Sequence, residues 1–362
     1  MLADQVTYVI GVDTHRDAHS AAVLTAAGAV QAQDSFAADA FGYKRLLRFA
    51  QRNAGGARAW AIESSGSYGS GLSCFLLSHG ERVFEVERPE RGARRNGAKS
   101  DELDAIRAAR QALTRTHLAQ PRRRGDREAV RVLLVTRRGA IRARTKAINH
   151  LKALVVTARE ELRHQLRNTP TDELVARCAR LRTLPVHSDE HRATVIALRH
   201  TARRILMLEA EANDLETEIE RLITRAVPFL LDEIGVGPIS AAQLYCSWSH
   251  PGRLRSDSAF AMLGGAAPIP ASSGQTIRYR LNRAGDRQLN CALHTIILSR
   301  LQHDPTTRAY AARRAAEGKT PREIKRCLKR YLARHLFRLL EANTDAPSTP
   351  RAPRSRTVGH CS

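Results

Sequence analysis

The first 118 residues alternate between short apolar runs and polar, turn-forming stretches, a pattern typical of a mixed α/β unit. The apolar and β-branched runs predict strands at residues 6–13, 20–25, 30–36, 59–63 and 82–87. Helical spacing predicts helices around residues 43–52, 72–77 and 100–113. The expected order is therefore a three-stranded meander followed by strand, helix, strand and helix.

The rest of the chain is predicted to be helical. One long helical pattern runs over residues 122–165, with its apolar residues on a single stripe. A heptad pattern follows, and it indicates either a coiled coil through which chains self-associate or an internal hairpin of helices. The a positions of this pattern are Leu198, Ile205, Ala212 and Ile219, and the d positions are Leu208, Leu215 and Leu222.

The last predicted helix has a clear start, since Thr320, Pro321 and Glu323 form a capping box. From Asn343 onwards the chain turns to Pro, Ser, Thr and Arg, which predicts a disordered tail. We therefore divide the chain into an α/β unit, a basic helical and coiled-coil region, a helical C-terminal unit and a tail. Their expected bounds are 1–118, 119–226, 227–342 and 343–362.

The regions differ in net charge, which suggests that they have different functions. The 362 residues include 59 Lys and Arg against 36 Asp and Glu, a formal net charge of +23. Residues 1–118 hold 15 basic and 13 acidic side chains, so nearly all of the net charge lies in the remainder. This distribution favours chemistry in the first unit and binding of a polyanion, most simply nucleic acid, by the rest.

The long helical pattern is the most basic stretch, with 11 basic and 2 acidic residues between positions 121 and 152. It predicts either a helix that follows a phosphate backbone or a solvated basic face on a packed helix. The residues that we expect to contact nucleic acid here are Arg137, Arg138, Arg142 and Lys146.

Several classes of protein are disfavoured by composition. No uncharged apolar run approaches the length of a membrane span, and the first residues lack the features of a secretion signal. The six cysteines form no C-x-x-C pair, so neither a zinc site nor a disulfide framework is indicated. We expect a soluble, cytoplasmic protein with no membrane partner.

Four carboxylates occupy positions where a metal site could form. Asp13 and Glu63 each end a predicted strand, and Asp101 and Asp104 share one face of a predicted helix. Gathered together they would repel one another unless cations held them, and Mg²⁺ prefers such oxygen ligands. Two Mg²⁺ ions in such a site clamp the attacking and leaving oxygens of a phosphodiester. The same acids could instead be turn residues or complement a helix dipole.

Three short motifs resemble the DEDD signature of insertion-sequence family 110 transposases, which are bridge-RNA-guided, serine-dependent recombinases. The motifs are Gly11-Val12-Asp13, Ala61-Ile62-Glu63 and Lys99-Ser100-Asp101-Glu102-Leu103-Asp104-Ala105, of which the third is the most specific. The resemblance implies an RNase H-like (RuvC-like) nuclease core in which Asp13, Glu63, Asp101 and Asp104 bind Mg²⁺. The predicted order of strands and helices is that of the same fold. Arg16 stands where a Lys is common in the family, and Ser100 replaces the usual Thr.

Residues 234–242 carry Gly235 and Gly237 between two apolar stretches. This pattern predicts a helix-hairpin-helix whose backbone N–H groups face a phosphate, or a plain turn between helices.

A loop rich in Gly, Pro and Ser follows at residues 263–274, and basic residues come directly after it. Guanidinium groups there could stabilise the charge of a pentacovalent phosphate. Residues 228–295 resemble the C-terminal transposase domain of the same family through G-x-G-P, G-x-x-P-x-x-x-S-S-G and the stretch from Arg280 to Arg287. The resemblance implies that Ser273 attacks DNA and forms a 5′-phosphoserine link, with Ser272 as the adjacent rival. The basic residues are Arg278, Arg280, Arg283 and Arg287.

Together these features predict a transposase that excises and inserts its own DNA element. Its expected partners are the element ends, the target DNA, a non-coding bridge RNA and further copies of the chain in a dimer or tetramer. One alternative is a metal-dependent resolvase of the Holliday-junction type that uses the carboxylates alone. Another is a non-catalytic protein that only binds nucleic acid.

Overall fold

The computed structural model describes residues 1–86, 101–122, 124–183, 188–270, 279–280, 282 and 285–343. The chain forms two compact units. The first, called the sheet unit below, comprises Met1–Arg124 and the short segment Gly252–Arg255. The second, called the helical unit, comprises Gly125–Pro251 and Ser256–Ser362.

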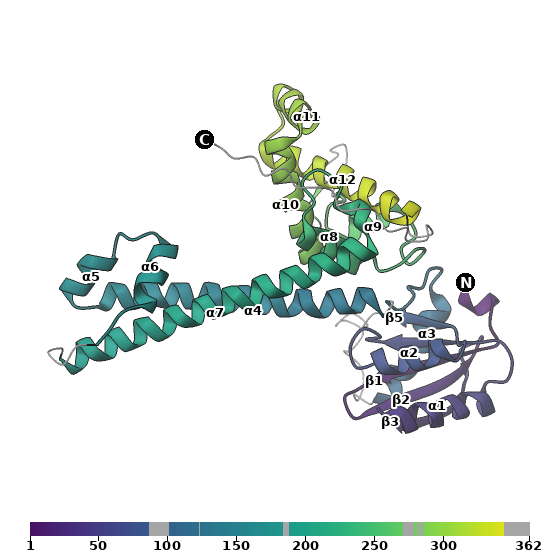
Figure 1. Ribbon diagram of the computed structural model, residues 1–362. Helices are drawn as coiled ribbons and strands as arrows, with labels where there is room; N and C mark the ends of the chain where they lie inside the picture. The colour runs from purple at the N-terminus through teal and green to yellow at the C-terminus, as the bar shows by residue number, and fades with distance from the viewer. Residues whose placement is uncertain are drawn as a thin grey trace. The chain divides into compact units, whose positions relative to one another are not determined.

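The sheet unit contains five strands in the order β3-β2-β1-β4-β5 (Figure 1). The first three form an antiparallel meander, whereas β4 runs parallel to β1 and β5 runs parallel to β4. All five strands and the three helices predicted for this unit are present, with bounds shifted by a few residues. They are β1 (Tyr8–Thr14), β2 (Ala18–Thr25), β3 (Val30–Ala37), α1 (Ala40–Asn53), β4 (Arg58–Glu63), α2 (Ser70–Ser78), β5 (Val83–Val86) and α3 (Asp101–Thr114), after a short 3₁₀ helix, η1 (Leu2–Asp4).

The two faces of the sheet are covered by different helices. Because side chains alternate along a strand, even-numbered residues of β1 and β4 pack with α1 and α2, and odd-numbered residues pack with α3. Gly11 permits a very close approach on the second face. A Cβ atom on Gly11 would lie 2.0 Å from the carbonyl oxygen of Ala105 and 2.7 Å from the amide nitrogen of Ala109. The backbone of α3 therefore rests directly on β1.

The helical unit is built on two long helices, α4 (Asp126–Thr157) and α7 (Asp189–Ala226), which lie side by side (Figure 1). The single helix expected over residues 122–165 ends early, because the backbone is extended at Ala158. After this break, α5 (Glu160–Leu166) and α6 (Thr171–Ala179) fold back onto the end of the pair. The break allows Leu162 and Leu166 to join the apolar cluster between α4 and α7.

The heptad residues of α7 pack within the same chain. The four a positions, from Leu198 to Ile219, are at most 2% exposed. Leu198 and Ile205 share a core cluster with residues of α4, and α7 packs along α4. Of the two interpretations of the heptads, the internal hairpin is therefore the one that these residues adopt.

The remaining elements are η3 (Pro228–Leu230), α8 (Pro238–Trp248), α9 (Asp257–Leu263), β6 (Ile269–Pro270), β7 (Tyr279–Arg280), α10 (Arg287–His303), α11 (Pro305–Ala316) and α12 (Pro321–Asn343). The predicted capping box starts α12: the amide of Glu323 donates to Thr320 Oγ1 at 3.3 Å, and the amide of Thr320 donates to Glu323 Oε2 at 2.9 Å. Asn343, the first residue of the predicted tail, is the last residue of α12, and the rest of the tail lies outside the described residues. Within the described part of the chain, none of the helices combines the length and the apolarity that a membrane span requires.

Candidate active site

Asp13 and Glu63 lie next to each other at the ends of two parallel strands. β1 and β4 are in register up to Val12 and Ile62, so the next residue of each strand is one of these acids. Both acids have the odd numbering of the sheet face that α3 covers, and both are only 6% exposed. The fold thus concentrates two carboxylates, which are hard oxygen donors, at one edge of the sheet.

Two hydrogen bonds organise this edge. Thr14 Oγ1 donates to the carbonyl oxygen of Glu63 at 2.9 Å, which ties the end of β1 to the end of β4. His15 Nε2 lies 3.0 Å from Asp13 Oδ2. Sequence reasoning overlooked both residues, although Thr14 and His15 directly follow the first acid. Thr14 therefore fixes the backbone at Glu63, and His15 contacts the carboxylate of Asp13.

The first turn of α3 lies at the same edge. Ala105 sits over Gly11, and the far end of the helix shares a core cluster with Leu2 and Val6 near the start of the chain. The helix therefore starts at the acidic end of β1 and runs back along that strand. Asp104, in the first turn of the helix, lies near this acidic end. Asp104 is 25% exposed and accepts a hydrogen bond from Arg107 Nη1 at 2.7 Å. The side chain of Asp101 lies outside the described residues.

The structure thus brings together only some of the four predicted acids. The strands bring Asp13 and Glu63 together, and the backbone of α3 places Asp104 at their edge. Among the described residues, no three Asp, Glu, His or Cys side chains are close enough to hold a metal ion. The donors nevertheless match magnesium in kind, since all four are carboxylates and Mg²⁺ prefers oxygen ligands.

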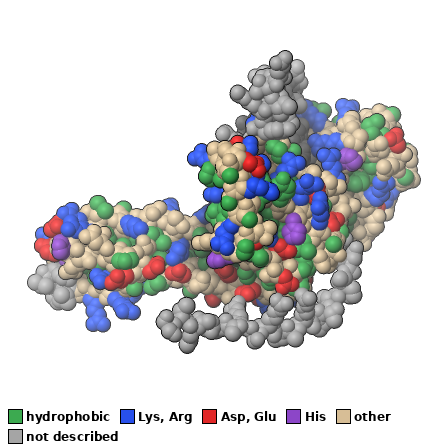
Figure 2. All heavy atoms as spheres, turned by 90° about the horizontal axis from the view of Figure 1, so that it is seen from above, with side chains coloured by type: hydrophobic (Ala, Val, Ile, Leu, Met, Phe, Trp, Pro, Cys, Tyr) green, Lys and Arg blue, Asp and Glu red, His purple; other side chains and the backbone are tan. Residues whose placement is uncertain are grey.

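The basic residues predicted on α4 divide into two groups. Arg137 forms an ion pair with Glu216 of α7, and Arg138 Nε donates to the carbonyl oxygen of Leu134. Arg142 and Lys146, one helical turn apart, are exposed. Lys and Arg side chains are prominent on the helices in the face drawn in Figure 2. Of the four predicted residues, the exposed Arg142 and Lys146 are therefore the ones available to a phosphate.

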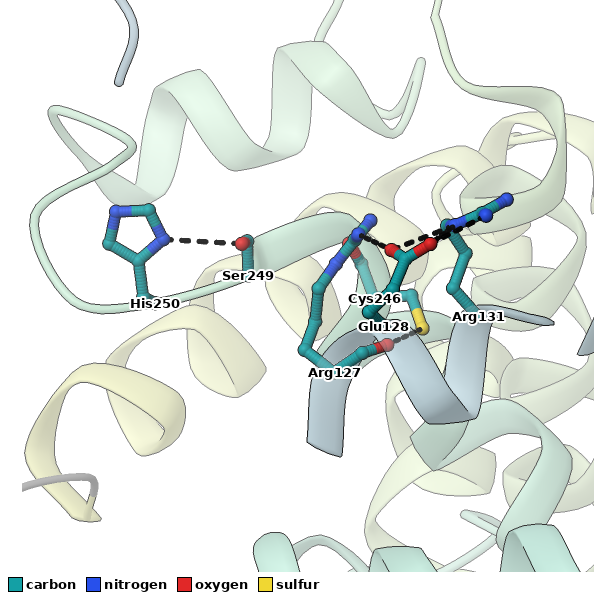
Figure 3. A network of polar contacts seen from close by, with 6 residues as sticks. All are labelled: Arg127, Glu128, Arg131, Cys246, Ser249 and His250. Atoms are coloured by element: carbon teal, nitrogen blue, oxygen red, sulfur yellow. Dashed lines mark hydrogen bonds and ion pairs between the residues drawn. The ribbon is translucent and has the colours of Figure 1, made fainter. Parts of the chain in front are cut away.

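A further basic residue of α4 has a structural task. Arg127 is 5% exposed, and its Nε and Nη2 donate to the carbonyl oxygen of Cys246 at 3.2 and 3.0 Å (Figure 3). Its Nη1 also donates to Glu128, which in turn accepts from Arg131. The start of α4 is thereby fixed to the end of α8, so part of the basic composition serves the fold.

The glycine turn before α8 leaves the expected helix-hairpin-helix unconfirmed. The only helix between α7 and the glycines is the three-residue η3. Gly235 has φ +81° and packs against α10, where an added Cβ would lie 3.0 Å from the carbonyl oxygen of Ile296. Arg300 Nε also donates to the carbonyl oxygen of Ile234 at 2.8 Å. Gly237 has open space around it and precedes α8 as its N-cap.

Ser272, Ser273, Arg278 and Arg283 lie outside the described residues, and Arg280 and Arg287 are exposed. The chain on both sides of the serines is held by residues that sequence reasoning missed. Asn290 Nδ2 donates to the carbonyl oxygen of Gly264 at 2.6 Å. Asp286 caps α10 by accepting from the amide of Gln288, and it also accepts from Ser247 Oγ. An Asp directly before a helical pattern is an N-cap signal that could have identified this residue.

Comparison with known proteins agrees with these features. Residues 10–159 match the DEDD transposase family of IS110, and residues 229–312 match the family described as transposase IS116/IS110/IS902. The two matches together cover well over half of the chain. An insertion element IS900 protein of 42 kDa from Mycobacterium paratuberculosis is 26% identical over 316 residues, spanning 73% of this chain and 78% of the relative. The chain belongs to the IS110 family of transposases.

Proposed function

We propose that this transposase cuts and rejoins DNA through the carboxylates of the sheet unit and the hydroxyl of Ser273, guided by a bridge RNA. The observation that carries this proposal is the pair of buried acids, Asp13 and Glu63, at the strand ends where α3 begins. Two neighbouring carboxylates provide the hard oxygen ligands that Mg²⁺ prefers. The strand order, with an antiparallel meander followed by parallel β4 and β5, supports an RNase H-like fold for this unit.

Asp13, Glu63, Asp101 and Asp104 are the residues that would hold Mg²⁺. Bound there, the metal would supply charge that activates a hydroxyl and stabilises the phosphate during displacement. Ser273 Oγ loses its proton and bonds to the phosphorus, while the bond from phosphorus to the 3′ oxygen breaks. The 3′ oxygen leaves as a hydroxyl after taking up a proton. The 5′-phosphoserine link keeps the energy of the phosphodiester, so rejoining needs no nucleotide cofactor.

Basic side chains have separate tasks in this scheme. Arg280 and Arg287 follow the serines in the sequence. Both are exposed, as a residue that contacts a phosphate must be. The exposed Arg142 and Lys146 on α4 and the open N-terminus of α8 at Gly237 provide further contacts to a nucleic-acid backbone. The chain works as a dimer or tetramer that holds the element ends, the target and the RNA.

The test is a DNA cleavage assay with and without Mg²⁺. Asp13→Asn and Asp104→Asn keep the size of each side chain but remove its charge, and cleavage should fall at least about a hundredfold. Asp17→Asn is the matched control, because the Asp17 side chain is 85% exposed. Cleavage that survives both site variants, or that proceeds equally well with a chelator, contradicts the proposal and favours a non-catalytic nucleic-acid-binding protein.

A metal-dependent resolvase is the second candidate. It is favoured by one observation: the described acids of the site all belong to the sheet unit, whereas Ser273 falls within the range of the helical unit. Ser273→Ala separates the two functions. A resolvase with this substitution still cuts branched DNA, whereas the proposed transposase loses both cleavage and covalent attachment to DNA.

A further inference from the structure

A pocket of about 730 Å³ lies within the helical unit, between α12, the end of α11 and residues 265–268. This volume is in the range of sites that bind small molecules or single nucleotides. The lining is strongly basic, with seven Lys and Arg side chains and Glu323 as the single acid among its lining residues. The basic residues are Arg280, Arg314, Lys319, Arg326, Lys329, Arg330 and Arg334.

Among the residues that the structure describes, only two of these seven basic side chains form ion pairs. Arg314 pairs with Glu317, and Arg334 pairs with Asp257. Glu323 accepts hydrogen bonds from the Thr320 backbone and hydroxyl in the capping box, and the charges of Lys319 and Arg326 further lower the pKa of its carboxyl group. The other basic side chains of the pocket have no ion pair within the described part of the chain, and together they create a positive potential that favours an anion. They are Arg280, Lys319, Arg326, Lys329 and Arg330.

Lys329 connects this pocket to the loop before the serines. Its Nζ donates to Asn290 Oδ1 at 3.0 Å, and Asn290 Nδ2 donates to the carbonyl oxygen of Gly264 at 2.6 Å. Burial lowers the pKa of Lys329, and the charge of Arg326 lowers it further. An anion in the pocket would therefore stabilise the charged form of Lys329. Lys329 in turn is hydrogen-bonded to Asn290, which holds the start of this loop.

One aromatic residue in the pocket is unusually accessible. Tyr331 is 58% exposed, and its ring meets that of Tyr310 edge-on, with centroids 6.0 Å apart and an interplanar angle of 82°. An exposed ring beside several guanidinium groups is the arrangement that stacks a nucleobase while cations hold its phosphates. A free phosphate has no base that could stack on this ring, and a base inside a duplex cannot reach it because both of its faces are already stacked.

We propose that this pocket binds an unpaired nucleotide segment of a nucleic-acid strand. The phosphates lie against Lys319, Arg326 and Arg330, and a base stacks on Tyr331. The inference rests on the proposed function for the source of the strand, which is either DNA opened at the cleavage point or the guide RNA. Both sources share the phosphodiester and base chemistry that the pocket recognises.

The test uses the full chain with a chelator, so that binding is measured without cleavage. Fluorescence anisotropy compares a labelled single-stranded DNA, an RNA of the same sequence and the corresponding DNA duplex. Tyr331→Ala should weaken binding of the preferred single strand at least about fivefold and leave duplex binding unchanged, because stacking is lost. Tyr331→Phe keeps the ring and should bind like the unmodified protein. The strand that loses more affinity, DNA or RNA, identifies the source.

Charge variants test the phosphate contacts. Arg326→Gln should reduce the slope of log Kd against log salt concentration by about 0.7 for the single strand, the value expected for one phosphate contact. Arg322→Gln is the matched control, because Arg322 is exposed on the same helix but does not line the pocket. Equal effects of the two Arg variants overturn the inference, as does a Tyr331→Ala protein that binds single strands normally.

These outcomes are separable from those of the proposed function. Asp104→Asn should bind the single strand normally, because that residue does not line the pocket. A protein whose pocket variants lose strand binding but which never cleaves DNA contradicts the proposed function alone. A protein that cleaves DNA while its pocket variants bind normally contradicts the pocket alone.

Discussion

Gly11 is the residue on which the position of α3 depends, and through α3 the position of Asp104. Gly11→Ala places a Cβ atom 2.0 Å from the carbonyl oxygen of Ala105, so the helix must move away from β1. We expect the free energy of unfolding to fall by about 1–3 kcal/mol, the usual cost of overpacking. Denaturant unfolding measures this, with Gly55→Ala as control, since nothing lies within 4 Å of that position. Equal stability of both variants would show that α3 does not rest on β1.

Glu81 gives the sheet unit a dependence on pH. Burial by itself would raise its pKa, but hydrogen bonds from Arg58 and from Trp60 Nε1, at 2.8 Å, outweigh burial and hold the pKa below its ordinary value of 4.5. A lowered carboxyl pKa contributes stability that is complete above pH 4.5 and is lost as the pH falls through the lowered pKa. Glu81→Gln should therefore show a flatter decline of unfolding free energy in this acidic range. Parallel curves for the two proteins would contradict the assignment.

At the scale of elements, the α4–α7 pair is held by an internal apolar seam. Ile205 is 1% exposed within it, so Ile205→Ala should lower the free energy of unfolding by about 2–5 kcal/mol. Met207 is 64% exposed on the same helix, and Met207→Ala should change stability by less than about 0.5 kcal/mol. Light scattering should show the same molar mass for the unmodified protein and the Ile205 variant. A variant that dissociates without losing stability would place the seam between chains instead.

The elements of the sheet unit could be predicted because β1, β2 and β4 are short, mostly apolar runs bounded by turn residues. The mostly polar β3 was indicated only by its place after a turn. It could not distinguish an internal hairpin from a coiled coil between chains, since the same heptads satisfy both. It also overextended the first long helix, because Leu162 and Leu166 continue its apolar stripe although the chain turns at Ala158.

The site was predictable in part for similar reasons. Asp13 and Glu63 could be placed at strand ends from local pattern, and the parallel pairing of β1 and β4 then brings them together. The pocket on α12 was not predictable, because Lys329 meets Asn290 only through tertiary folding. On α4, pattern alone does not separate Arg137, which is paired with α7, from Arg142, which is exposed.

In the molecule as a whole, the candidate acidic site and the basic pocket belong to different units of the chain. The buried acids belong to the sheet unit, and the basic pocket and the exposed cations of α4 belong to the helical unit. Many of the 59 Lys and Arg residues are neutralised within the chain, as Arg137 and Arg334 are. Affinity for nucleic acid should therefore depend on the exposed subset rather than on total charge.

Under the proposed mechanism, the serine hydroxyl and the carboxylates of the sheet unit act on the same phosphate. This mechanism is tested most directly by incubating the protein with element-end DNA and Mg²⁺, stopping the reaction with denaturant, and locating any DNA-linked residue by mass spectrometry. We expect a 5′-phosphate on Ser273 in the unmodified protein and no adduct in Asp104→Asn or with a chelator. DNA cut in the presence of Mg²⁺ without any serine adduct, or an adduct that forms equally well in Asp104→Asn, would contradict it.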